Sequence, residues 1–232
     1  MRAKGLSAVP LRGVESVTLP GAMDAFCRLA DDWGKLGLDR CLAPAIRYAE
    51  EGVPVAPRVA LDWAEDADYL TLEARQHYLF NGKAPHVGQI FRAPGQAEVL
   101  RRVARDGRKG FYEGEVAEDM LSSLRALGGS HTLEDFSSVS CDYMNPIAGP
   151  YHGIELIEHP PNTQGATAIL MLNILSHFDQ AAMDPFGTQR AHIEAEAAKL
   201  AYDARNRFIA ETAPRLDHML APETAAKLAA LI

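Results

Sequence analysis

Apolar residues recur at helical spacing along most of this chain of 232 residues. A repeat near 3.6 residues is typical of amphipathic helices that bury one face. Glycine and proline punctuate the repeat at many points, as they commonly do at helix ends. The pattern therefore predicts helices over approximately residues 21–33, 38–51, 58–80, 96–106, 109–127, 188–211 and 222–232.

The pattern changes near residue 160. A β-type run, Ile154–Ile157, is followed by Pro160 and Pro161, which cannot donate hydrogen bonds to a strand ladder. The polar loop Asn162-Thr163-Gln164-Gly165 comes next, and an apolar run with helical spacing continues to Phe178. The sequence thus predicts a strand, a rigid turn, a polar loop and a buried helix.

The polar loop is the candidate substrate-binding site. A loop of this kind places backbone N–H groups at the N-terminus of a helix, where partial positive charge favours an anion. Its residues are Asn162, Thr163, Gln164 and Gly165. The same residue types also suit an ordinary connection between a strand and a helix, and spacing alone favours that simpler interpretation.

Other groupings of reactive residues do not form a recognisable centre. His192 and Glu196 share one helix face near Glu194, but a metal site would need further ligands. The basic residues between 101 and 109 are predicted to form a solvated helix face. The sequence therefore predicts no metal site, no cofactor and no catalytic residue within this chain.

The three cysteines, Cys27, Cys41 and Cys141, are far apart and odd in number. This spacing fits neither a disulfide framework nor a metal site. We expect all three to be reduced, buried small residues.

Composition narrows the class of protein. The chain is 47% hydrophobic and carries a net charge of -8, which is ordinary for a globular domain and argues against a nucleic-acid partner. No apolar run is long enough to cross a membrane. The first residues lack the apolar core of a signal peptide, which favours a cytoplasmic location.

The predicted fold class is α+β and predominantly helical. Only short extended runs accompany the helices, within residues 140–153 and at Ile154–Ile157. So few strands do not form a stable sheet by themselves. We therefore expect the chain to be a segment of a larger fold.

Several motifs resemble one known family in both content and order. They are Ser16–Ala22, Leu42–Gly52, Gly110–Gly114, Gly128-Gly129 with Thr132–Phe136, Pro160–Gly165, Leu172–Leu175 and Glu194–Tyr202. Together they resemble the γ-glutamyltransferase (γ-glutamyltranspeptidase) family. The resemblance identifies residues 1–232 as the central part of that family's large subunit, with both ends of the family domain missing.

The resemblance implies the αββα sandwich of the N-terminal-nucleophile hydrolases. It implies acyl transfer from, or hydrolysis of, a γ-glutamyl amide such as glutathione. The nucleophile would be an N-terminal threonine that lies outside this chain, on a small subunit cut from the same precursor. We carry over no catalytic residue, and we expect this chain alone to be inactive.

Two alternatives stay open beside the γ-glutamyl interpretation. The Asn-Thr-Gln loop differs from the double-serine loop of glutathione-cleaving members and is more similar to related amidohydrolases and acylases. A substrate of the oxamate type is therefore one alternative. The other is a stand-alone, non-catalytic helical domain.

A segment cut from a sandwich should expose the apolar surface that its missing layers cover. Ile154, Leu156, Leu170 and Ile174 are predicted to form such an exposed seam. Because large apolar patches are unusual on monomers, we expect dye binding or homo-oligomers for the chain in isolation.

Overall fold

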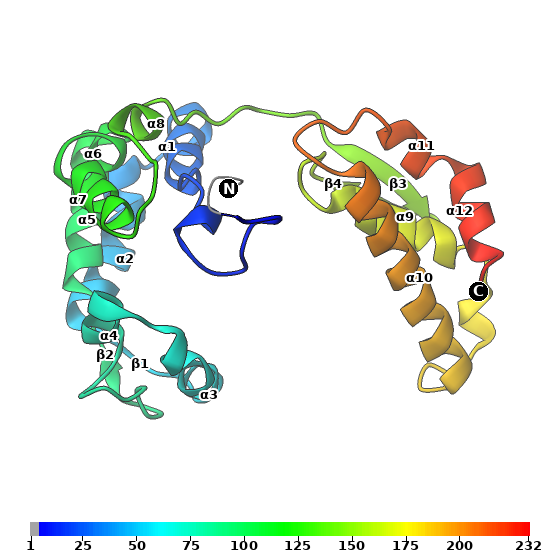
Figure 1. Ribbon diagram of the computed structural model, residues 1–232, viewed down its shortest axis with the longest axis horizontal. Coiled ribbons are helices and arrows are strands. Elements are labelled where there is room, and N and C mark those ends of the chain that lie inside the picture. Colours follow the sequence, from blue (N-terminus) through cyan, green and yellow to red (C-terminus); the bar gives the residue numbers. More distant parts are fainter. Residues whose placement is uncertain (1–4) are drawn as a thin grey trace. The chain divides into compact units, whose positions relative to one another are not determined.

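The computed structural model describes residues 5–232, and the chain divides into two compact units at Cys141 (Figure 1). The first unit is almost entirely helical. Its helices and short strands are η2 (Val14–Ser16), α1 (Ala22–Trp33), α2 (Leu38–Glu51), β1 (Val53–Pro54), α3 (Pro57–Asp66), η3 (Ala67–Tyr69), α4 (Leu72–Tyr78), β2 (Ile90–Phe91), α5 (Pro94–Asp106), α6 (Lys109–Tyr112), α7 (Gly114–Ala126) and α8 (Leu133–Ser137).

Helix α2 packs along α5 in the first unit. The predicted bounds of α2 are confirmed, and the helix contains Pro44 in its interior. Gly52 ends the helix with a φ of 90°, and an added Cβ would lie 2.5 Å from Ile90. A glycine is therefore needed both for the backbone conformation and for the close approach of β2.

Two predicted long helices are each broken into shorter pieces. The predicted helix over residues 58–80 is α3, η3 and α4, because Leu70 and Thr71 adopt extended conformations between them. The predicted helix over residues 109–127 is α6 and α7, which are separated by the extended residue Glu113. Gly114, the first residue of α7, has a φ of 66°. The helical repeat persists across both breaks, so the sequence pattern did not show them.

The second unit begins with a β-hairpin and continues as helices. Its elements are β3 (Ile147–Tyr151), β4 (Ile154–Glu158), α9 (Gly165–Leu175), η4 (Gln180–Ala182), α10 (Thr188–Phe208), α11 (Leu216–Leu220) and α12 (Pro222–Ala229). Strands β3 and β4 pair in antiparallel register, with Gly149 opposite Leu156. His152 and Gly153 both have positive φ, at 46° and 84°, which is typical of a tight type I′ hairpin turn.

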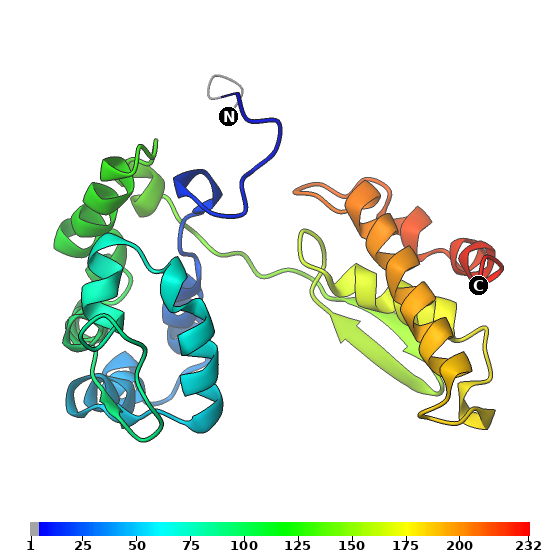
Figure 2. The ribbon, with the colours of Figure 1, turned by 60° about the horizontal axis from the view of Figure 1, so that its bottom comes forward.

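Helix α9 lies at the centre of the second unit (Figure 2). It contacts the hairpin, and it also contacts α10, α11 and α12. Leu170 and Ile174 are fully buried among small residues of α10, which include Ala197 and Ala201. The predicted exposure of Leu170 and Ile174 is therefore wrong, because a helix that is apolar all round is covered on every side.

The other half of the predicted seam is exposed in part. Ile154 is 68% exposed, whereas Leu156 is half-buried. Ile157 is 62% exposed although the sequence did not select it. It lies on the face of the hairpin opposite Leu156, which alternation along the strand requires. An apolar residue on this bare face fits a segment of a larger layered fold.

The cysteine prediction is partly corrected. All three thiols are free, but only Cys27 is buried. Cys141 is half-buried, and Cys41 is exposed on α2. Within residues 5–232, the structure contains no helix with the length and apolar character of a membrane span.

Candidate functional site

Strand β4 delivers the chain to the candidate loop, and Gly165 starts α9 directly against the end of that strand. A Cβ added to Gly165 would lie 2.4 Å from the carbonyl oxygen of His159 and 2.5 Å from Cβ of Glu158. No side chain fits at this distance. The glycine thus lets the first turn of α9 contact the strand that precedes it.

Thr163 stabilises the loop through its hydroxyl group. Its Oγ1 lies 3.1 Å from the carbonyl oxygen of His159 and 2.9 Å from that of Pro160, and it donates to these acceptors. Such contacts are typical of a side chain that closes a turn. Among residues 5–232, the hydroxyl of Thr163 hydrogen-bonds to these two backbone carbonyls and to no basic side chain, so Thr163 has a structural role in the loop.

Two loop side chains reach the end of α10 and the segment after it. The Nδ2 of Asn162 donates to Oε2 of Glu211 at 3.1 Å. The Nη1 of Arg205 donates to Oε1 of Gln164 at 3.2 Å. The sequence did not assign roles to Glu211 or Arg205, which follow the loop by at least forty positions.

Arg205 brings positive charge beside the loop. Its Nε and Nη2 donate to Oδ1 of Asn206 at 3.1 and 2.8 Å, and its guanidinium lies 4.9 Å from the ring centre of Tyr202. Across residues 5–232 no carboxylate pairs with Arg205. By contrast, Arg207 is neutralised by Asp203 at 2.8 Å. The charge of Arg205 is therefore met only by neutral groups.

The backbone amides at the start of α9 differ in their acceptors. The amides of Thr167 and Ala168 donate to the carbonyl oxygen of Gln164, at 2.9 and 3.3 Å. In the described structure, the amides of Gly165 and Ala166 have no such acceptor. Both of these residues are buried, and Ala166 is 0% exposed. The half-buried guanidinium of Arg205 is therefore the group of this loop region that suits an anion such as a carboxylate.

The four predicted site residues thus come together in one loop, three of them exposed and Gly165 buried. Their binding role stays a prediction. Nothing in the spacing of the sequence linked Arg205 to the loop, because forty positions separate Arg205 from Gly165.

The histidine and glutamate cluster on α10 is an ion-pair surface. Glu196 accepts from Lys199 at 2.7 Å, and Glu194 accepts from Arg190 at 2.7 Å. The hydrogen bond from Lys199 holds the pKa of Glu196 below its usual range. No group of three or more histidine, cysteine, aspartate or glutamate side chains is placed to hold a metal ion anywhere in residues 5–232.

The first unit contains a buried charge that the sequence did not predict. Asp24 on α1 is buried, and its Oδ1 accepts from Nε of Arg108 at 2.5 Å. Its Oδ2 accepts from the backbone amide of Cys141 at 2.7 Å. Arg108 also donates to the carbonyl oxygens of Ser137 and Val139. The prediction that Arg108 belongs to a solvated face is therefore wrong.

The surroundings of Asp24 favour its charged form. Burial by itself raises the pKa of Asp24, but hydrogen bonds from Cys141 and Arg108 outweigh it, and the pKa lies below its ordinary value. The hydroxyl of Tyr112 accepts from the Asp24 amide at 3.1 Å and donates to the carbonyl oxygen of Pro20. These hydrogen bonds connect α1 to α6 and to the segment that ends at Cys141, so they stabilise the first unit. We therefore do not select Asp24 as a candidate catalytic residue.

Comparison with known proteins identifies relatives along the whole chain. The family profile described as gamma-glutamyltranspeptidase matches residues 1–232. The chain is 32% identical over 213 residues to the glutathione hydrolase-like YwrD proenzyme of Bacillus subtilis, covering 90% of this chain and 41% of that protein. It is also 32% identical over 238 residues to the oxamate amidohydrolase proenzyme of Klebsiella pneumoniae, covering 97% and 44%. The chain thus spans about two fifths of the length of these relatives.

A solved structure supports the same relationship. The cephalosporin acylase from Bacillus halodurans superimposes with a TM-score of 0.88 at 34% identity, covering 100% of this chain and 45% of the acylase. The predicted fold class, a mainly helical segment of a larger α+β protein, is confirmed by this match.

Proposed function

This chain belongs to the gamma-glutamyltranspeptidase family, and from this we propose that it is the central part of an enzyme that transfers or hydrolyses the acyl group of a small amide. A γ-glutamyl amide of the glutathione type is the first candidate substrate. The family membership carries the proposal, since the loop itself contains no nucleophile paired with a base.

The partner in this proposal is the remaining part of the same precursor. The two relatives described above are named proenzymes, and each is more than twice as long as its match to this chain. The other part would supply the nucleophile and the donors that stabilise the oxyanion of the tetrahedral intermediate. This chain would supply part of the scaffold and a substrate-binding loop.

We assign the loop the task of holding a carboxylate of the substrate. Arg205 carries a charge that no carboxylate of the described residues neutralises, and it lies against Gln164. Gln164 directly precedes α9, so Arg205 lies near the start of that helix, where the helix dipole adds positive potential. Glutathione and oxamate both carry carboxylates, so either fits this requirement.

An oxamate-type or acylase-type substrate is the second candidate. It is favoured by the Asn-Thr-Gln form of the loop and by the similarity to an amidohydrolase over 97% of the chain. Turnover of γ-glutamyl p-nitroanilide and of oxamate by the complete processed protein distinguishes the two. Failure to hydrolyse any amide after processing would contradict the proposed reaction class.

The loop is tested by comparing two arginines in the complete protein. Arg205→Gln should raise KM for an anionic amide about tenfold, since a charged hydrogen bond is lost, with a smaller change in kcat. Arg207→Gln is the matched control, because Arg207 is paired with Asp203 and should leave KM unchanged. Equal KM values for both variants would remove the loop from the substrate site while leaving the reaction class intact. The isolated chain serves as a blank and should show no turnover.

A further inference from the structure

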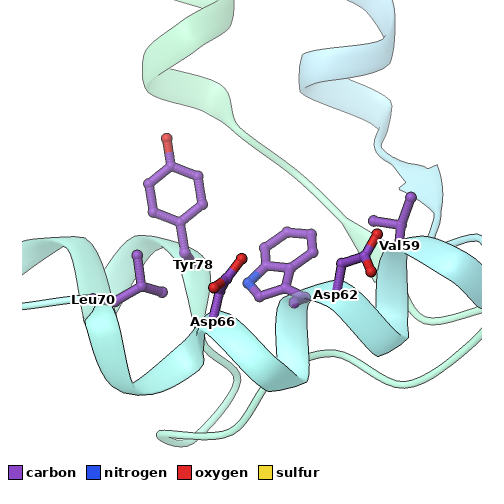
Figure 3. A pocket seen from close by; sticks show the side chains of 6 residues that line it. Val59, Asp62, Asp66, Leu70 and Tyr78 are labelled. Carbon is purple, nitrogen blue, oxygen red and sulfur yellow. The ribbon is translucent and has the colours of Figure 1, made fainter. Parts of the chain in front are cut away.

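An open pocket of about 350 Å³ lies in the first unit, on one face of α3 (Figure 3). Its lining side chains are Val59, Asp62, Trp63, Asp66, Leu70 and Tyr78. The volume falls within the range of small-molecule sites, which are commonly apolar with a few polar groups. This pocket combines an aromatic wall with two carboxylates, and no part of the proposed function uses it.

The two aromatic side chains of the pocket, Trp63 and Tyr78, both contact the ring of Phe91. Trp63 meets Phe91 of β2 edge-on, with ring centres 4.9 Å apart and an interplanar angle of 70°. Tyr78 stacks on the same Phe91, with centres 6.0 Å apart and planes inclined by 17°. Trp63 and Tyr78 are themselves 6.3 Å apart and tilted by 54°. The two rings therefore form a preformed, inclined pair.

The carboxylates stand beside Trp63 on successive turns of α3, as Figure 3 shows. Asp62 accepts from Nε of Arg58 at 2.8 Å, an exposed ion pair of small energetic weight. Asp66 has no ion-pair partner within residues 5–232. The surrounding segment, residues 57–78, contains five carboxylates and two arginines. One of these arginines, Arg75, donates to the carbonyl oxygens of Ala67 and Leu70 at 3.1 and 3.2 Å.

We propose that this pocket binds a small organic cation, namely an ammonium group that carries a short apolar chain. The faces of Trp63 and Tyr78 attract a cation through their ring quadrupoles. The unpaired carboxylate of Asp66 supplies the opposite charge, and the excess of acids nearby repels anions. Val59 and Leu70 provide apolar contact for the chain of the ligand.

Three ligands of nearly equal shape test the requirement for charge. Choline is the cation, 3,3-dimethyl-1-butanol is its neutral counterpart and 3,3-dimethylbutyrate is the anion. Binding to the chain is measured by NMR from the indole N–H signals, which Trp63→Phe and Trp33→Phe assign. Choline should shift the Trp63 signal with a Kd in the millimolar range, roughly fivefold tighter than the alcohol, and the butyrate should not bind.

Variants locate the binding to the pocket. Asp66→Asn should weaken choline binding roughly threefold to fivefold, and added salt should weaken it for the unaltered chain. Glu65→Gln is the control, because it removes one neighbouring acid that does not line the pocket, and it should change Kd far less. Both changes are at exposed positions, so folding is retained, which the thermal melt verifies.

Four outcomes would overturn the proposal. They are absence of a choline-dependent shift, equal affinity for the alcohol, equal effects of Asp66→Asn and Glu65→Gln, and a Trp63 signal that moves with protein concentration before any ligand is added. The last outcome would mean that a second copy of the chain covers the pocket.

Discussion

The second unit is organised around an apolar helix, whereas the first unit is organised around a buried carboxylate. In the second unit, α9 is apolar all round and small residues of α10 approach it closely. In the first unit, Asp24 joins α1, Arg108 and the segment that ends at Cys141. Apolar periodicity in the sequence predicted a buried helix at α9, although it placed Leu170 and Ile174 on an exposed seam. A long-range polar network leaves no periodic pattern, so the pairing of Asp24 with Arg108 was not predictable at all.

The largest loss of stability is expected for a substitution at Leu170, in the centre of α9. Leu170→Ala should lower the free energy of unfolding of the second unit by about 2–5 kcal/mol, because it leaves a cavity in a fully buried site. Denaturant unfolding followed by helical circular dichroism measures this loss. Both tryptophans lie in the first unit, so their fluorescence should follow an unchanged transition.

Ile157→Ala is the matched control for Leu170→Ala. Ile157 is 62% exposed, so its truncation should cost less than about 0.5 kcal/mol. Equal losses for the two variants would restore the sequence-based prediction that Leu170 lies on an exposed seam.

The polar core is tested at Arg108. Arg108→Ala leaves the buried carboxylate of Asp24 without its cation and should destabilise the first unit by about 3 kcal/mol. Tryptophan fluorescence during unfolding reports this change. Arg105→Ala removes an exposed pair with Asp106 and should cost less than about 1 kcal/mol.

The effect of Arg108→Ala should depend on pH in one direction. The folded pKa of Asp24 is below its value in the unfolded chain, so the charged carboxylate stabilises the fold above about pH 3.9. This contribution is lost as the pH falls through the folded pKa. The difference between the parent and Arg108→Ala should therefore shrink below pH 4, and a constant difference would contradict the assigned role of Asp24.

The smallest change in stability is expected for a substitution at Thr167, within the apolar core of the second unit. Thr167 on α9 is buried, and its hydroxyl has no hydrogen-bond partner in the described structure. Thr167→Val should stabilise the second unit by about 1 kcal/mol, because it removes an unsatisfied buried group without changing the shape. Thermal unfolding measures the gain.

Thr163→Val is the control for Thr167→Val, because the hydroxyl of Thr163 is hydrogen-bonded. Its hydroxyl donates to two backbone carbonyls of the loop, so its removal should destabilise by about 0.5–1 kcal/mol. If Thr167→Val lowers the melting temperature, as Thr163→Val should, the hydroxyl of Thr167 has a hydrogen-bond partner.

Local chemistry accounts for the elements that the sequence predicted correctly. The bounds of α2 follow from its apolar stripe and from Gly52. Thr132 and Asp135, three positions apart, form a capping box at the start of α8. The strand Ile154–Ile157, the proline turn and the helix of the candidate loop appear in that order. These features depend on residues within a few positions of each other, which is why a single sequence contains them.

Tertiary packing decided the features that the sequence alone could not determine. The family and the loop Asn162-Thr163-Gln164-Gly165 came from the sequence, whereas the partners Arg205 and Glu211 came from the approach of α10 and its following segment. The burial of Leu170 and the pairing of Asp24 with Arg108 also came from tertiary contacts. The physical reason is that burial and charge pairing depend on which elements meet in space, and residues separated by dozens of positions leave no local pattern that predicts their contact.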